Sequence, residues 1–450
     1  MERVPNRTVL AYAATEFPSA MAAIPMAIFI PALYTRDLGL SLAAVGTLMM
    51  ISRLTDMLTD PFIGLLSDRT RTRFGRRKPW IVAGTPIMLL SVYMLFVPAP
   101  PVGNFYFGFW MITLWLGWTF IYIPYYAWGA ELSTDYHERT RIATWRTAVN
   151  VSGTLATILL PLASSLLFGY GKALNESLKL IAFGAMAFSA VTVTLLLTLV
   201  PEPPPIVTDR ITIWRGIRVM WRNGPFKRLM LGFTIGGIGP ALAAPLYVLY
   251  VNQIIKEDLA GSVILLVFYI GNLIGVGAWA LLARRVGKRT AWLVGMSMMI
   301  LSQPWYMTLG PGDLPGMMAI LFVGGLGAGS FVALPAAMKA DVIDIDRLRS
   351  GEDRTGLFFS VWSLATKMIL AFSVGIAFWA LDLAGFHAAG ENGAAQLWAL
   401  KIVFSGIPVL CYALAMAIVW NYPITEARHA RLIGRLQRRA ERAAAQAAAA

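Results

Sequence analysis

The fold is decided by residues 41–99, which are SLAAVGTLMMISRLTDMLTDPFIGLLSDRTRTRFGRRKPWIVAGTPIMLLSVYMLFVPA. An apolar run over 41–66 and a second over 80–99 flank a short loop rich in arginine and lysine. A bilayer core about 30 Å thick is crossed by about 20 apolar residues in a helix, so each run is long enough to span it. A membrane β-barrel would show alternating segments of about ten residues instead. The stretch therefore predicts two transmembrane helices joined by a basic loop.

Similar apolar runs fill the rest of the chain. We predict twelve spans, at 9–34, 41–66, 80–99, 105–130, 147–169, 178–200, 227–252, 259–282, 290–310, 315–338, 355–382 and 396–422. The segment 201–226 begins with prolines, which cannot continue a helix, and then favours a basic amphipathic helix over 211–218. The predicted fold is an all-α membrane protein with two six-helix bundles, 1–200 and 227–422, a cytoplasmic linker at 201–226 and a cytoplasmic tail at 423–450.

Composition narrows the class of protein. Of the 450 residues, 57% are hydrophobic and only 14% are charged, with a mean hydropathy of +0.63. A soluble domain carries about 25% charged residues, so the composition excludes a soluble enzyme, a disordered chain and a nucleic-acid-binding domain. A single cysteine, Cys411, and three scattered histidines exclude a disulfide framework and a Cys/His zinc site. No nucleophile, metal-ligand or P-loop motif is present, so we predict a protein that is not an enzyme and binds no cofactor.

Lysine and arginine set the orientation. They gather at every second connection and in the tail, whereas the other connections hold only Arg36, Lys172, Lys179 and Lys256. The positive-inside rule then places both termini in the cytoplasm. The richness in alanine and arginine suggests the inner membrane of a bacterium. We expect a monomer whose partners are the lipid bilayer and a small-molecule substrate, with no nucleic acid.

The two halves of the chain show a weak internal repeat. Phe74-Gly75-Arg76-Arg77 after the second span is similar to Val286-Gly287-Lys288-Arg289 after the eighth. Glu138-Arg139-Thr140 is similar to Asp353-Arg354-Thr355 at nearly the same offset. A parallel repeat predicts two bundles that can rock about a central site.

Carboxylates in the second span are the first candidate site. Asp56 and Asp60 lie four residues apart and share a helix face, and Arg53 lies three residues before Asp56. Two desolvated carboxylates cannot both stay ionised without a cation or a shared proton. The pair predicts a coupling site for Na⁺ or H⁺, to which Thr59 and Thr119 could add hydroxyl oxygens. The alternative is a set of structural ion pairs.

Other intramembrane charges are candidates for coupling, gating or substrate binding, because each is costly in the bilayer. Lys367 in span eleven needs an acidic partner, for which Asp56 or Asp60 is the candidate, or else forms a structural salt bridge. Glu16 lies in a proline-rich first span and could bind substrate or act as a gate. Arg146 at the start of span five could pair with acids or gate the cavity.

Aromatic residues crowd the fourth span. Trp118, Tyr122 and Tyr126 share a face with Thr119. Aromatic rings with polar edges stack on sugars, but they also form interfacial belts and ordinary packing. The sequence leaves these alternatives open.

A family resemblance follows from a long motif. Arg53-x-x-Asp56-x-x-x-Asp60-Pro61-x-x-Gly64, followed by residues 67–80, SDRTRTRFGRRKPW, resembles the glycoside–pentoside–hexuronide:cation symporters. These are the melibiose-permease relatives of the major facilitator superfamily, and the animal sodium-dependent lysolipid symporters are similar in the same stretch. The resemblance implies the major facilitator fold and cation-coupled symport. Ile123-Pro124, Arg146 and Lys367 also match.

The resemblance implies roles for individual residues. Asp56, Asp60 and Thr119 match the family's cation site, Lys367 matches a lysine that interacts with it, and Arg146 matches an arginine near the sugar cavity. Thr59 replaces an asparagine of the Na⁺-using members.

Two departures bear on the substrate. Ala20 and Tyr122 stand where melibiose-type members place carboxylates that hold sugar hydroxyls. These departures count against a galactoside and leave room for a more apolar or an anionic substrate, since Arg146 and Lys367 remain as basic partners. The resemblance still implies a symporter of a glycoside, oligosaccharide or uronide, with a lysolipid or another amphipath as the alternative.

Overall fold

The structure, a computed structural model, describes residues 4–133, 135–170, 173–202, 223–257, 262–350 and 355–424. Within these ranges the regular structure is helical, apart from an isolated bridge between Thr72 and Gly75. Eleven helices in the described part of the chain are long and apolar enough to cross a membrane. The all-α prediction is therefore confirmed.

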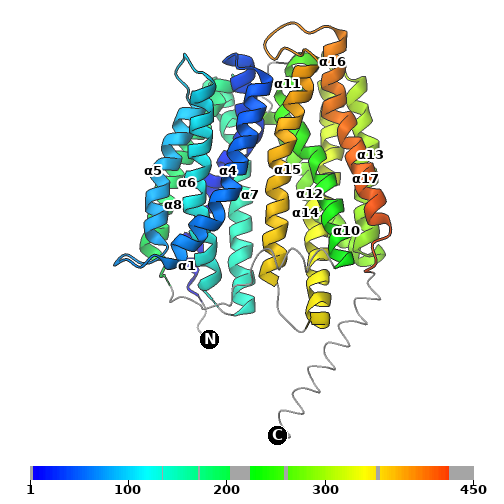
Figure 1. Ribbon diagram of the computed structural model, residues 1–450. Helices are drawn as coiled ribbons and strands as arrows, with labels where there is room; N and C mark the ends of the chain where they lie inside the picture. The colour runs from blue at the N-terminus through cyan, green and yellow to red at the C-terminus, as the bar shows by residue number, and fades with distance from the viewer. Residues whose placement is uncertain are drawn as a thin grey trace. The chain divides into compact units, whose positions relative to one another are not determined.

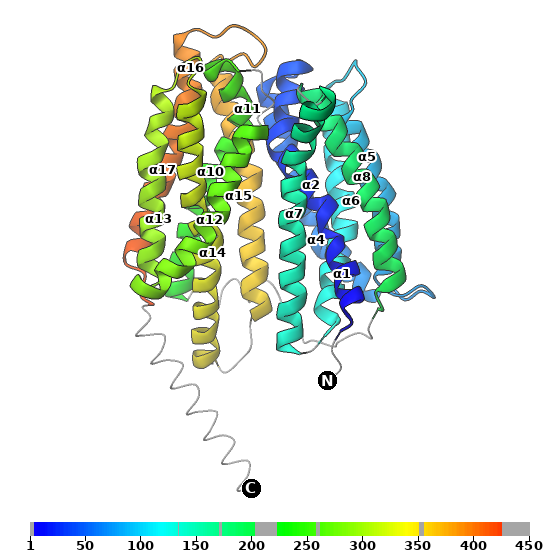
Figure 2. The same ribbon diagram turned by 180° about the vertical axis from the view of Figure 1, so that it is seen from behind.

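The chain packs into two compact units, of which the first holds the candidate site. It takes the described residues of Met1–Thr208, Ala244–Leu266 and Leu370–Leu400. Its elements are α1 (Asn6–Ala14), α2 (Glu16–Ile24), η1 (Pro25–Phe29), α3 (Ile30–Ala32), η2 (Leu33–Asp37), α4 (Leu42–Arg69), α5 (Lys78–Phe96), α6 (Asn104–Glu131), α7 (Tyr136–Phe168), α8 (Leu174–Leu199), η3 (Ala244–Leu246), α11 (Tyr247–Tyr250) and η4 (Val251–Ile255). Helix α6 packs against α4 and α5 (Figure 1), and α1 and α2 pack along α7 (Figure 2).

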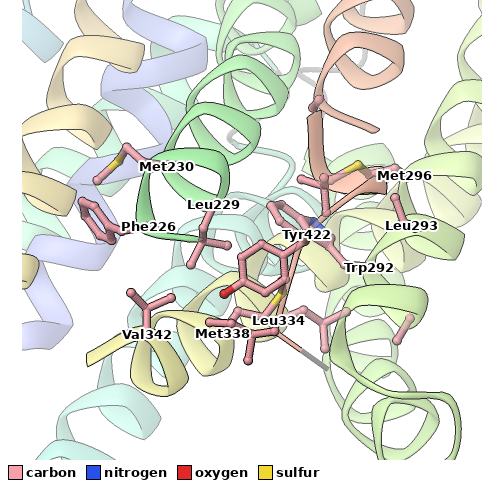
Figure 3. Packing of buried hydrophobic residues seen from close by; sticks show 14 of the residues in the cluster. Phe226, Leu229, Met230, Trp292, Leu293, Met296, Leu334, Met338, Val342 and Tyr422 are labelled. Carbon is pink, nitrogen blue, oxygen red and sulfur yellow. The ribbon is translucent and has the colours of Figure 1, made fainter. Parts of the chain in front are cut away.

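The second unit takes the described residues of Asp209–Ala243, Val267–Ile369 and Lys401–Ala450. Its elements are α10 (Gly224–Ala243), α13 (Lys288–Ser302), η5 (Gln303–Thr308), α14 (Leu314–Ser350), η6 (Ile402–Gly406) and α17 (Ile407–Trp420). Helices α12 (Ser262–Val286), α15 (Thr355–Leu383) and α16 (Ala394–Lys401) contribute residues to both units. Figure 3 shows its core, where Leu229 of α10, Trp292 of α13 and Met338 of α14 are buried together with Tyr422.

The first span is interrupted, as its prolines predict. Helix α1 stops at Thr15, α2 begins at Glu16, and π-helical turns η1 and η2 follow. Pro18 has no N–H to donate to the carbonyl one turn before it, so the helix cannot pass through this point unchanged. The break presents the Thr15 carbonyl to another helix, and the Tyr122 hydroxyl of α6 donates to it at 3.2 Å.

The predicted ninth span, 290–310, is present as α13 followed directly by the 3₁₀ turns of η5. Pro304 lies at the start of η5 and supplies no N–H to an α-helical ladder. This change of helix type is why α13 alone is shorter than the other spans.

Two helix boundaries predicted from hydropathy are wrong. Helix α7 begins at Tyr136 rather than near 147, and α14 continues to Ser350 rather than ending near 338. Charged residues carry both extensions: the Asp135 side chain caps α7 by accepting from the Glu138 backbone N–H at 2.9 Å, and Lys288 pairs with Asp341 of α14 at 2.7 Å. As a result, Arg146 and Lys339 lie inside α7 and α14. The predicted spans 147–169 and 315–338 end one residue short of each.

The internal repeat has a structural counterpart in each unit. Gly75 and Gly287 both have positive φ, +109° and +83°, and each precedes a helix that begins at a lysine. The basic residue after each glycine pairs with an acid of another helix, Arg76 with Glu131 and Lys288 with Asp341, both at 2.7 Å. This supports the duplication. The second sequence match of the repeat includes Asp353 and Arg354, which lie outside the described residues. The predicted linker helix at 211–218 and most of the tail also lie outside them, so the division of the chain at 201–226 stays a prediction.

Helices α4 and α15 approach closely within the first unit, at the end of α4 near Leu42. A Cβ on Gly46 would lie 2.8 Å from the Phe378 Cβ, and the Trp379 indole donates to the Thr47 hydroxyl at 2.9 Å. Gly375 of α15 faces Met50 of α4 in the same way, with 3.1 Å between its ideal Cβ and the sulfur. The two glycines make this approach possible.

We predict that Gly46→Leu abolishes solute uptake in reconstituted vesicles while leaving insertion and expression intact, because the leucine separates α4 from α15. Phe378→Gly in the same chain should restore part of the uptake, because it removes both the Cβ and the ring atoms that the leucine meets. Gly277→Leu is the control, since no atom lies within 4 Å of an added Cβ there. Normal uptake by Gly46→Leu would show that the close approach is dispensable.

Candidate functional site

The two predicted carboxylates meet a hydroxyl of a second helix. Asp56 and Asp60 project from one face of α4, and Asp56 is only 2% exposed. The Thr119 hydroxyl of α6 lies 2.8 Å from Asp56 Oδ1 and 3.0 Å from Asp60 Oδ1. The structure therefore brings together three of the residues that the sequence assigned to a cation site.

The proton count at this cluster is informative. A threonine hydroxyl carries one hydrogen, so it can donate to only one of the two carboxylates. That hydrogen is therefore given to one acid or shared between the two. Carboxylates this close repel each other, and a neighbouring positive charge or a bound proton lowers the repulsion.

Thr59 and Arg53 of α4 lie next to the two carboxylates. The Thr59 hydroxyl donates to the Asp56 backbone carbonyl at 3.2 Å, so its hydrogen points along its own helix. The Arg53 guanidinium lies over the Trp115 ring of α6, with its central carbon 3.4 Å from the ring centroid. Stacking on an aromatic face stabilises a cation in a place where water cannot.

A second charged cluster joins α2 to α7. Arg146 donates to Glu16 Oε1 through Nε at 2.9 Å and through a terminal nitrogen at 2.7 Å. Asn150, one turn further along α7, lies 3.4 Å from Glu16 Oε2. Glu16 is buried, so the pair replaces the water that both charges would otherwise bind.

Tyrosines surround this ion pair. The Arg146 guanidinium carbon lies 4.6 Å from the Tyr126 ring centroid and 5.4 Å from that of Tyr125. Tyr12 and Tyr125 stack at 4.4 Å, and each hydroxyl donates to the other's backbone carbonyl at 3.0 Å. Tyr126 is 41% exposed, whereas Tyr125 is fully buried. The cluster is rigid on its buried side and accessible on the Tyr126 side.

Aromatic rings of α6 connect the two clusters. Trp115 contacts Trp118 at 5.6 Å, Trp118 contacts Tyr122 at 4.4 Å, and Tyr122 contacts Tyr126 at 5.8 Å between centroids. Arg53 covers the first ring and Arg146 the last. We call these four rings, Trp115, Trp118, Tyr122 and Tyr126, the α6 ladder.

Comparison with protein families decides the class of protein. The model described as MFS/sugar transport protein matches residues 11–426. The chain belongs to this family. The predicted major facilitator fold is thereby confirmed, and a solved structure agrees: the nucleoside transporter NupG superposes with a TM-score of 0.64 at 12% identity, covering 93% of this chain and 100% of that one.

Two relatives found by sequence comparison are named as symporters. The putative glycoside/cation symporter YagG of Escherichia coli is 28% identical over 414 residues, which cover 88% of this chain and 87% of that protein. The sodium-dependent lysophosphatidylcholine symporter 1-B of Danio rerio is 26% identical over 424 residues, covering 84% and 79%. These matches support a multi-pass, cation-coupled symporter of the MFS type, in a family of transporters rather than enzymes.

Both departures from the sugar-binding pattern of this MFS family are packed positions. Ala20 is buried against α7, where an ideal Cβ on Gly153 would lie 3.0 Å from the Ala20 Cβ. The Tyr122 ring is buried in the ladder, and its hydroxyl is engaged by Thr15. Neither position offers the space that a solvated carboxylate would need.

Lys367 lies in the part of α15 that belongs to the second unit and is half-buried. Its pairing with Asp56 or Asp60 stays a prediction.

Several contacting residues were not predicted from the sequence. Asn150 could have been found, because it follows Arg146 by one helical turn. Tyr12 and Trp115 could not, since an aromatic residue in a membrane helix has many roles. The basic loop also has unpredicted partners: Arg77 pairs with Asp68 at 2.7 Å and with Glu131 at 2.9 Å, and Glu202 accepts from the backbone N–H groups of Arg76 and Arg77 at 2.7 Å.

We predict that Glu16→Gln destabilises the protein by about 3–5 kcal/mol, because it leaves the Arg146 charge without its carboxylate. The double variant Glu16→Gln/Arg146→Gln should be less destabilised than the single one, since no unpaired charge remains. Thermal unfolding in detergent measures both, and Glu391→Gln in an exposed loop is the control. Additive losses in the double variant would argue against the coupling of the two charges.

Proposed function

We propose that the chain carries a glycoside, oligosaccharide or uronide across the membrane together with Na⁺ or H⁺ by alternating access. The observation that carries this proposal is the convergence of Asp56 and Asp60 on the single hydroxyl of Thr119. Two neighbouring carboxylates repel each other, and a bound cation or proton lowers this repulsion. Coupling ions in transporters bind at such intramembrane oxygen clusters.

Either ion fits the chemistry of this cluster. Na⁺ would be bound by Asp56, Asp60 and Thr119 oxygens, with Thr59 adjacent. A proton would sit on one carboxyl group, which would then donate to the Thr119 oxygen. Both ions remove the repulsion between carboxylates and so favour the same packing of α4 on α6.

The α6 ladder supports a link between ion and substrate. Thr119 lies on the same helix as Tyr122 and Tyr126, so a change in how α4 packs on α6 is transmitted to the Glu16–Arg146 pair. A hydroxyl or carboxylate of the substrate would compete with Glu16 for the Arg146 guanidinium, next to the accessible ring of Tyr126. We assign substrate binding to Glu16, Arg146, Tyr126 and Trp118, and coupling to Arg53 and Lys367.

A lysolipid is the second candidate substrate. The positions where carboxylates would hold sugar hydroxyls, Ala20 and Tyr122, are packed, and the exposed part of the cluster is the ring of Tyr126. The likeness to a lysophosphatidylcholine symporter favours the same alternative. For either substrate we infer a monomer in a bacterial inner membrane, with both termini in the cytoplasm.

We predict that Asp56→Asn abolishes cation-driven accumulation, because an amide cannot supply the charge that holds a cation or a proton. Substrate binding should persist, since Asp56 belongs to a different cluster from Arg146. Reconstituted vesicles with an imposed Na⁺ or pH gradient measure accumulation, and equilibrium exchange measures carrier activity without a gradient.

Asp37→Asn is the matched control, as Asp37 is an exposed carboxylate that pairs with Arg36. Uphill accumulation by Asp56→Asn would contradict the coupling-site assignment. A panel of glycosides, uronides and lysolipids on a charge-sensing membrane, with and without Na⁺ at two pH values, identifies both solute and ion.

A further inference from the structure

Lys339 is a buried lysine of α14 in the second unit, and no role assigned above uses it. It is 6% exposed and lies in the charged end of the candidate span Leu314–Asp346. Burial of an ionisable side chain is costly and therefore marks a candidate functional site.

Two aromatic rings of α15 surround the Lys339 ammonium. Its nitrogen lies 3.8 Å from the Phe359 ring centroid and 4.8 Å from that of Trp362. Trp362 is held in place by stacking on Phe233 of α10, with centroids 4.1 Å apart. Phe359 is 52% exposed, so the group is closed on the Trp362 side and accessible on the Phe359 side. We call Lys339, Phe359 and Trp362 the lysine cage.

The cage leaves the charge of Lys339 incompletely satisfied. Among the residues that the structure describes, the Lys339 ammonium has no carboxylate within salt-bridge distance and no hydrogen bond to an oxygen. By contrast, Lys288 of α13 pairs with Asp341. Cation–π contacts stabilise a lysine but occupy none of its three N–H donors as an oxygen acceptor would. A buried charge in this condition favours an incoming anion.

We propose that Lys339 binds the anionic group of the transported solute, a carboxylate or a phosphate, while Phe359 and Trp362 cover the apolar part next to it. This rests on the proposed function and specifies it: the substrate is an anionic uronide-type or phosphate-bearing molecule rather than a neutral glycoside. Lys367 lies on α15, about two helical turns from Phe359. The helix that supplies the rings of the lysine cage therefore also carries a lysine.

Matched pairs of solutes test the proposal on the full-length chain in detergent. Methyl β-D-glucuronide is compared with methyl β-D-glucoside, and a lysophosphatidic acid with the monoacylglycerol of the same acyl chain. Within each pair the anionic group is the difference, and the two pairs distinguish a carboxylate from a phosphate. Titration calorimetry gives the dissociation constants for the unaltered chain and for Lys339→Gln, Lys339→Arg and Lys256→Gln.

We expect Lys339→Gln to weaken binding of the anionic member at least about tenfold, and to change binding of its neutral partner less than twofold. Lys339→Arg keeps the charge and should retain most of the affinity. Lys256→Gln removes an exposed lysine and should change neither. Lys339→Met, which keeps the length of the stem and removes the buried charge, replaces Lys339→Gln if that variant does not fold.

Equal loss for anionic and neutral solutes, or equal affinity of the unaltered chain for both members of each pair, would overturn the proposal. Binding of no anionic solute by the unaltered chain would do the same. Failure of the proposed function gives a different result: anion binding would still depend on Lys339, but no solute would accumulate under a Na⁺ or pH gradient.

Discussion

Water would normally separate two carboxylates that lie one helical turn apart, but the packing of α6 on α4 removes it from Asp56. The Thr119 hydroxyl takes its place and faces both acids at hydrogen-bond distance. In the proposed function a cation or a proton binds here and lowers the repulsion between the two acids, so that its binding strengthens the packing of α4 on α6.

Helix α6 connects the proposed ion site to the first span. Its aromatic ladder runs from the ring under Arg53 to the ring beside Arg146, and its tyrosines bond to backbone carbonyls of the first span. Those carbonyls are accessible because the span is interrupted at Thr15. The proline-rich first span and the tyrosine-rich fourth span thus depend on each other, since the break in one supplies acceptors for the hydroxyls of the other.

Two lysines of the second unit are stabilised by different kinds of partner. Lys288 is neutralised by Asp341, in the same relation as Arg76 to Glu131 in the first unit. Lys339 instead lies between aromatic rings. Aromatic rings stabilise a cation without cancelling its charge. The lysine cage is therefore proposed to bind the anionic group of a solute, which a fixed carboxylate of the protein would prevent.

The sequence by itself determined the membrane class, the all-α fold and the approximate spans, because hydropathy and helical spacing are local properties. It also named the candidate residues of an ion site, because the motif around Asp56 is long. It named Thr119 as a hydroxyl that could join the carboxylates, and the family resemblance assigned the same residue to the cation site. The tertiary structure decided which side chains are partners: Glu16 with Arg146, Arg53 with Trp115, and Lys339 with Phe359 and Trp362. It also corrected the start of α7 and the end of α14. Hydropathy drops where charged residues begin, but capping and ion pairs such as Lys288–Asp341 stabilise the helix beyond that point. Partners far apart in sequence are set by packing, and no local pattern records them.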